Sequence, residues 1–112
     1  MTMRAWTGAI VAGVLLATSG AASAAEAWTT ARRITHLYPN AGGLIFMLDG
    51  PSIGPPNCEN RFKVPLSAAG YDAIVSTIIT AFAGNFTVDA NYDDTTLAGC
   101  DAIVNRVLVA RG

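Results

Sequence analysis

Charged side chains are scarce in this chain of 112 residues, and neither sign dominates. Lys, Arg, Asp and Glu together make up 13% of the sequence, and seven basic residues stand against eight acidic ones. Proteins that bind nucleic acids draw much of their affinity from cations that neutralise phosphates. The composition therefore argues against a nucleic-acid partner.

Groups that perform catalysis or bind metals are equally few. The chain has one histidine, His36, and no pattern pairs it with the serine and the acid that a catalytic triad needs. A zinc site requires three or four ligands. Four aspartates near the second cysteine lack the ligand spacing of a calcium loop, and these are Asp89, Asp93, Asp94 and Asp101. We therefore expect no metal, no cofactor and no enzyme activity.

A long apolar segment is also missing. The apolar stretch from Ala5 to Ala17 is shorter than the roughly 20 residues that cross a bilayer. It follows Arg4 and precedes small residues that end with Ala22-Ser23-Ala24. This order is typical of a secretory signal peptide cleaved after Ala24. We predict that residues 1–24 are removed and that the protein is periplasmic or secreted, without stable insertion in the membrane.

The remainder, residues 25–112, contains no linker, repeat or low-complexity tract and is long enough for a single domain. It holds two cysteines, Cys58 and Cys100. In an oxidising compartment they most simply form one disulfide, and a metal pair or a reactive thiol are the alternatives. Closing a loop of about 42 residues would stabilise the domain by about 4 kcal/mol.

Strand signals occur on both sides of one helical segment. The apolar run from Leu44 to Leu48 is typical of a strand buried on both faces, and residues 61–64 alternate between apolar and basic. The stretch from Pro39 to Gly43 indicates a turn. The expected strands cover residues 28–38, 43–49, 61–65, 85–92 and 102–110.

Residues 70–83 are predicted to form a helix. Apolar side chains recur there at helical spacing on one face, and they are Tyr71, Ile74, Val75, Ile78, Ile79 and Phe82. We expect Ser67 or Gly70 to cap its start and Gly84 to adopt a left-handed conformation after its end. The opposite face carries small, uncharged side chains that could contact another copy of the chain, and they are Ala73, Ser76, Thr77, Thr80 and Ala81.

The order of three strands, one helix and two strands is that of the oligonucleotide/oligosaccharide-binding (OB) barrel. We therefore predict a mainly β, five-stranded, OB-fold-like domain with strand order β-β-β-α-β-β. The helix would close one end of the barrel.

Several short motifs resemble those of the subtilase cytotoxin B-like family of exported bacterial proteins. They are the early Trp28, the turn Gly42-Gly43, Pro55-Pro56-Asn57-Cys58, Arg61-Phe62-Lys63-Val64, the helix from Asp72 to Phe82 and the ending from Gly99 to Val107. The resemblance covers most of residues 25–112. It implies a sugar-binding barrel that can form a ring of five subunits and carry a toxic enzyme. It places no sugar-contacting residue on this chain.

Aromatic side chains give the best indication of a binding site. Trp28, Tyr38 and Tyr92 lie near the ends of expected strands, where a ring can stack on a ligand while its polar tip stays in water. Packing within the barrel is the alternative role. The favoured function is an exported, non-enzymatic binding module that recognises a glycan or a protein. A small enzyme, or an enzyme inhibitor acting through the Pro-rich loop 50–57, is the competing interpretation.

Overall fold

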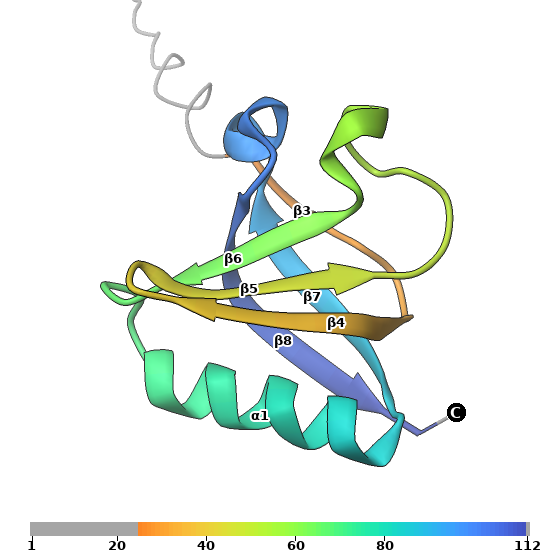
Figure 1. The fold of residues 1–112 in the computed structure, drawn as a ribbon, viewed down its shortest axis with the longest axis vertical. Helices are drawn as coiled ribbons and strands as arrows, with labels where there is room; N and C mark the ends of the chain where they lie inside the picture. Colours follow the sequence, from red (N-terminus) through yellow and green to blue (C-terminus); the bar gives the residue numbers. More distant parts are fainter. Residues whose placement is uncertain (1–24, 112) are drawn as a thin grey trace, which may run out of the picture.

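The computed structural model describes residues 25–111, which form a ring of strands with one main helix (Figure 1). The elements are β3 (Glu26–Trp28), β4 (Arg32–Asn40), β5 (Gly43–Leu48), η3 (Pro56–Cys58), β6 (Arg61–Pro65), α1 (Tyr71–Gly84), β7 (Thr87–Asp93), η4 (Asp94–Gly99) and β8 (Ala102–Ala110), where η3 and η4 are short 3-10 helices. The described strands form one six-stranded sheet in the order β3-β7-β4-β5-β6-β8, and pairing between β7 and β8 closes the ring. The expected signal peptide lies outside the described residues.

The expected first strand, residues 28–38, is in fact two strands. β3 and β4 both pair with β7, but the chain leaves the ladder between them, where Thr30 has a left-handed φ of 66°. At this break the buried Thr29 accepts a hydrogen bond from the Ala90 N–H through its hydroxyl, at 3.0 Å, and donates its own N–H to the Ala90 carbonyl, at 2.9 Å. The Thr29 hydroxyl thus takes the place of a backbone carbonyl as the acceptor for the Ala90 N–H, and the chain bends between β3 and β4. The ring consequently has six strands in place of the five expected.

The hairpin between β4 and β5 is tighter than the sequence suggests. β4 continues through Pro39, which was expected in the turn, and Asn40 pairs directly with Gly43. Pro39 can lie in a strand because β4 pairs with β7 only at Arg32 and Arg33, so no second ladder needs its missing N–H. Gly43 is required here, since its φ is 140° and a Cβ atom would lie 2.1 Å from the Val64 carbonyl oxygen.

The core fills the inside of the ring. Its fully buried large side chains come from β5, β6, α1, β7 and β8, and they include Phe46, Phe62, Val64, Ile78, Val88 and Val104. The prediction for residues 44–48 is confirmed, because four of these five side chains are buried and only Met47 is partly exposed. The inward positions of Phe62 and Val64 are confirmed as well.

The predicted disulfide is present. Cys58 and Cys100 are bonded, with their Cα atoms 4.9 Å apart. The bond lies just before β6 and β8, which form the one parallel pairing described in the sheet, Phe62 with Ala102 and Lys63 with Ile103. It therefore holds the starts of β6 and β8 together.

The predicted helix is confirmed, with α1 one residue displaced at each end. Gly70 occupies the N-cap position in a left-handed conformation, and no side chain caps the helix there, so Ser67 does not serve this role. Asn85, not Gly84, adopts the left-handed conformation after the last turn. Asparagine tolerates that conformation better than other residues with a side chain, which leaves Gly84 inside the helix. No helix among residues 25–111 is both long and apolar enough to cross a membrane.

The buried face of α1 is narrower than predicted and is rotated. Ile78 and Ala81 are fully buried, whereas the side chains of Ile79 and Phe82 are 47% and 42% exposed. The helix lies across the lower end of the ring in Figure 1 and contacts strands on both sides of the opening, β4, β6, β7 and β8. Only the stripe that enters this opening is covered, so Ile79 and Phe82 remain at its margin.

This rotation also changes the proposed interaction face of the helix. Ala81 points into the core and does not belong to an exposed face. Thr77 is half-buried and donates its hydroxyl proton to the Ala73 carbonyl oxygen, at 2.8 Å. Ala73, Ser76 and Thr80 are exposed as expected.

Candidate functional site

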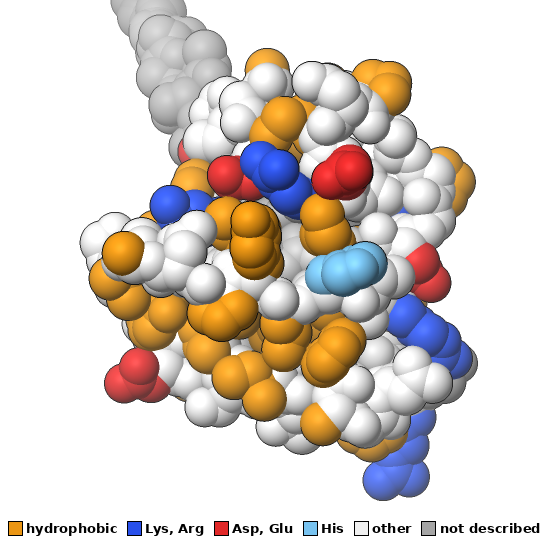
Figure 2. Space-filling view, in the orientation of Figure 1, with side chains coloured by type: hydrophobic (Ala, Val, Ile, Leu, Met, Phe, Trp, Pro, Cys, Tyr) orange, Lys and Arg blue, Asp and Glu red, His pale blue; other side chains and the backbone are white. Residues whose placement is uncertain are grey.

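A hollow of about 300 Å³ lies on the outer face of β4, β5 and β6. Its lining residues are His36, Leu37, Tyr38, Met47, Glu59 and Arg61. Figure 2 looks onto this face and shows the pale blue histidine near its centre, with basic and acidic side chains above it. We refer to this feature as the β4–β6 hollow.

Strand register builds the hollow from residues that are distant in sequence. His36 pairs with Met47, which pairs with Arg61, so the three side chains form one row on the outer face. A second row runs from Tyr38 through Ile45 to Lys63. An irregularity between Ile34 and His36 shifts the register of β4. It leaves Ile34 in the core and brings His36 to the outside.

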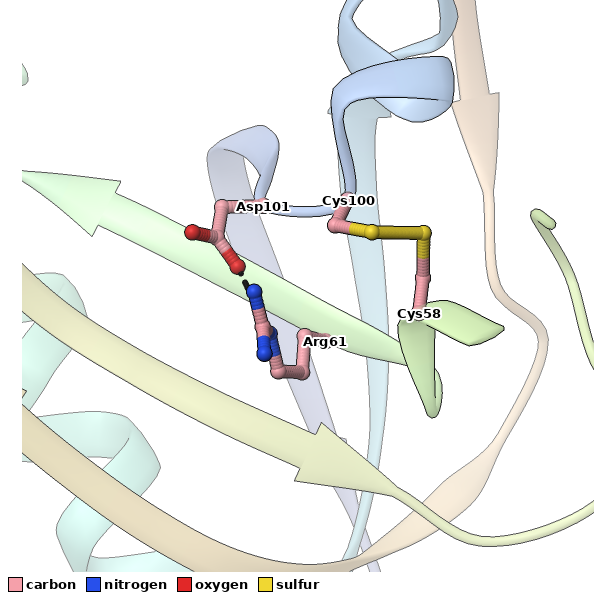
Figure 3. Close-up of polar contacts among 4 residues, drawn as sticks. All are labelled: Cys58, Arg61, Cys100 and Asp101. Atoms are coloured by element: carbon pink, nitrogen blue, oxygen red, sulfur yellow. Dashed lines mark hydrogen bonds and ion pairs between the residues drawn. A yellow bond between two sulfur atoms is a disulfide. The ribbon is translucent and has the colours of Figure 1, made fainter. Parts of the chain in front are cut away.

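An ion pair fixes the upper rim of the hollow. The Arg61 Nε donates to Asp101 Oδ1 at 2.9 Å, immediately beside the disulfide (Figure 3). The disulfide holds together the chain segments that carry these two residues, so their approach is set by the fold. Within residues 25–111 the terminal nitrogens of the guanidinium make no hydrogen bond, which leaves their N–H donors for a ligand.

Tyr38 and His36 give the hollow its aromatic wall. The Tyr38 side chain is 57% exposed. The His36 Nδ1 lies 3.0 Å from the Thr35 hydroxyl, and within the described residues its ring has no acidic partner. The hollow combines the Tyr38 ring and the Met47 thioether with the charged groups of Glu59 and Arg61. This combination suits a ligand that is apolar on one face and hydroxylated at its edges.

The three aromatic candidates have different positions. Tyr38 lies at the hollow, whereas Trp28 lies on β3, in the sheet formed with β7 and β8. Tyr92 is 5% exposed and packs in the core with its ring centroid 5.3 Å from that of Phe62, so its ring offers little surface to a ligand. Burial raises its pKa above the usual value, and the charge of Asp94 acts in the same direction. Alternation along residues 85–92 places Tyr92 on the same face as Val88 and Ala90, and the structure buries that face.

Sequence reasoning missed most residues of the hollow. The outward positions of Arg61 and Lys63 followed from alternation along the strand, but nothing placed His36 or Met47 beside them. Only cross-strand register does this, and register depends on turn lengths and bulges that the pattern does not give. Glu59, the lining residue that precedes β6, has a left-handed backbone conformation with a φ of 59°.

Two of the four aspartates around Cys100 have local partners. Asp93 accepts hydrogen bonds from both the N–H and the hydroxyl of Thr95 at the start of η4, and Asp101 pairs with Arg61. Among residues 25–111, no three His, Cys, Asp or Glu side chains are placed to hold a metal ion.

The Pro-rich loop 50–57 is braced from its inner side. The buried Asn60 donates to the carbonyl oxygens of Gly50 and Pro51, both at 3.1 Å, and accepts from the Ile53 N–H at 2.9 Å. Arg32 donates to the Pro51 carbonyl at 2.6 Å. These hydrogen bonds hold loop 50–57 in one conformation.

Comparison with known proteins assigns the chain to no family. No protein-family model, curated protein or solved structure matches the chain.

Proposed function

We propose that this protein is an exported, non-enzymatic binding module that recognises a glycan through the β4–β6 hollow. The observation that carries the proposal is the hollow itself, in which an exposed aromatic ring, a guanidinium with free donors and a carboxylate meet around a thioether. Binding of a sugar needs this combination of a flat apolar surface and convergent polar groups.

The topology supports an OB-fold-like function. Without β3, the ring runs β4-β5-β6-β8-β7, which is first, second, third, fifth and fourth strand in chain order, and α1 lies between the third and fourth. OB folds bind oligosaccharides and oligonucleotides on the face of their second and third strands. Here those strands are β5 and β6, and they form the floor and rim of the hollow.

Charge favours a sugar over a nucleic acid. Arg61 and Lys63 project from β6, but Glu59 and Asp101 flank Arg61 and offset its charge. A groove for a polyanion would need an excess of cations along its length. The disulfide is compatible with an oxidising, exported setting.

A glycan array probed with the purified protein tests this proposal. Tyr38→Ala should weaken binding about five- to tenfold, because a stacked ring contributes about 1–1.5 kcal/mol. Tyr38→Phe should retain most of the affinity if stacking dominates. Thr80→Ala, on the exposed side of α1, is the matched control and should bind as the wild type does. An array without any bound glycan, or binding that Tyr38→Ala leaves unchanged, would exclude the hollow as a glycan site and favour a protein partner.

The braced loop 50–57 supports a second candidate, inhibition of an enzyme. A loop held in one conformation loses little entropy when it enters a partner's cleft, and Asn60 and Arg32 supply such bracing. A panel of proteases and glycosidases assayed with the protein would reveal inhibition. Asn60→Ala should abolish it while leaving any binding to the hollow in place.

A further inference from the structure

A separate row of side chains, away from the β4–β6 hollow, crosses the outer face of β3, β7 and β8. Trp28 pairs with Asn91, and Asn91 pairs with Arg106, so all three project from the same side of the sheet. The register then shifts, because Tyr92 pairs with Val104. Asn105 is therefore an extra residue in β8 opposite Asn91. Bulges of this kind re-aim side chains and are frequent beside binding sites.

Trp28 is exposed and has a movable neighbour. Its side chain is 42% exposed, and the Arg106 guanidinium carbon lies 5.7 Å from the ring centroid. The Arg106 Nη2 donates to Glu26 Oε1 at 3.0 Å, but both side chains are about half exposed. Exposed ion pairs of this kind are weak. Arg106 can therefore move off the ring at little cost.

Two buried polar atoms on this face have no partner within residues 25–111. The Asn91 side chain is 1% exposed, and its Oδ1 accepts from Asn105 Nδ2 at 3.1 Å, but its Nδ2 donates to nothing. Asp89, two residues earlier and on the same face of β7, has a buried Oδ1 that accepts from nothing. Buried polar groups in native proteins are almost always paired, so the unpaired donor and the unpaired acceptor on this face of β7 point to a missing partner.

We propose that Trp28, Asn91 and Asp89 form a sugar subsite for a neutral pyranoside. This inference rests on the proposed function, glycan recognition, and adds a second site with a defined ligand class. The C–H face of the pyranose stacks on Trp28 once Arg106 has moved aside. One hydroxyl then accepts from Asn91 Nδ2 and donates to Asp89 Oδ1.

The two orphaned atoms select a hydroxyl group as their partner. A carboxylate can accept from Asn91 but cannot donate to Asp89, and an ammonium group can donate but cannot accept. A hydroxyl does both. The nearby carboxylates of Glu26 and Asp89 outnumber the single cation of Arg106, so anionic sugars are disfavoured.

This subsite lies on a different face from the β4–β6 hollow. β7 and β8 run behind β4, β5 and β6 in the view of Figure 1, and the outer faces of the two sets of strands point in different directions around the ring. The two sites can therefore be tested separately.

Tryptophan fluorescence gives the test. The chain has two tryptophans, Trp6 and Trp28, and Trp6 lies in the expected signal peptide. Expression with Trp6→Phe ensures that the emission reports on Trp28 alone, whether or not the signal peptide is cleaved. Titration with cellobiose and with lactose should give a saturable change in emission, whereas sodium glucuronate should give none. Asp89→Ala should weaken the neutral sugars about tenfold, since a hydrogen bond to a charged group is lost. This variant removes an unpaired carboxylate, so the fold should be retained.

Further variants separate the two sites. Tyr38→Ala should leave the fluorescence titration unchanged. Trp28→Ala, followed by calorimetry in place of fluorescence, should lose binding to cellobiose, and Trp28→Phe should keep part of it, with circular dichroism as the check on folding.

The outcomes distinguish this inference from the proposed function. A flat titration with both neutral sugars, or an equal affinity in Asp89→Ala, overturns the subsite and leaves a water molecule as the partner of the orphaned atoms. If the wild-type protein still binds glycans on the array and Tyr38→Ala weakens that binding, the function proposed for the hollow stands without the subsite. If the titration saturates but Tyr38→Ala has no effect on the array, the subsite stands and the hollow falls.

Discussion

Removing the Cys58–Cys100 disulfide should open the ring first between β6 and β8. These strands pair through two residue pairs only, Phe62 with Ala102 and Lys63 with Ile103, and they run parallel. Parallel neighbours come from separate parts of the chain, so no hairpin keeps them together. The disulfide lies immediately before both strands and takes the place of such a connection.

The expected size of the effect follows from the loop that the disulfide closes. The cysteines are 42 residues apart in sequence. Closing a loop of this length removes about 4 kcal/mol of conformational entropy from the unfolded chain. A small domain has a net stability of about 5–15 kcal/mol. The disulfide therefore supplies between a quarter and most of the free energy of unfolding.

Urea unfolding and amide hydrogen exchange would measure this contribution. The Cys58→Ala/Cys100→Ala variant should lose about 3–4 kcal/mol of unfolding free energy. Its amides in β6 and at the start of β8 should exchange faster than those of the hairpin β4–β5. Reduced wild-type protein serves as the control and should behave like the variant. A loss below about 1 kcal/mol, or protection that falls evenly around the ring, would refute the reasoning.

Three further changes test single positions. Gly43→Ala should cost about 3 kcal/mol or prevent folding, because its Cβ would meet a carbonyl oxygen of β6 at 2.1 Å; Gly99→Ala, with open space, should change the urea midpoint little. Asn60→Ala removes the brace of loop 50–57 and should cost about 2 kcal/mol, and limited proteolysis should then cut that loop faster; equal cleavage would contradict the bracing role. Burial raises the pKa of Tyr92, so the folded state keeps this proton where the unfolded chain loses it. The contribution of Tyr92 to stability should therefore be constant below about pH 10 and fall above it, and Tyr92→Phe should reduce that fall in urea titrations at rising pH.

Features set by local chemistry could be predicted from the sequence. The disulfide followed from two cysteines behind an expected export signal, and the structure places them 4.9 Å apart at Cα. The span of α1 followed from a helical period of apolar side chains, which no strand can satisfy. The buried strand β5 followed from an uninterrupted apolar run that ends at Asp49-Gly50-Pro51.

Features set by the packing of distant segments could not be predicted. The break after Trp28 depends on Thr29 meeting Ala90, which lies 61 residues further along the chain. The hollow depends on the register that brings His36 beside Met47 and Arg61. A pattern of alternating side chains gives the face of a strand, but it does not give the neighbour of each residue on that face.

The exposed side of α1 provides the test of self-association, which stays a prediction. Figure 2 shows apolar side chains gathered over the lower part of the molecule, where α1 lies in Figure 1, and Ile79 and Phe82 are exposed there. Small neighbours such as Ser76 and Thr80 would let a second copy approach without the loss of water from a charge. We predict an oligomer in sedimentation at about 100 μM, a concentration that detects dissociation constants below that value. Phe82→Glu should dissociate it without unfolding the domain, because the side chain is already about half in water. Asp72→Asn, at the first turn of the helix, is the control and should leave the oligomer intact. A wild-type protein that sediments as a monomer would show that these apolar side chains face only solvent.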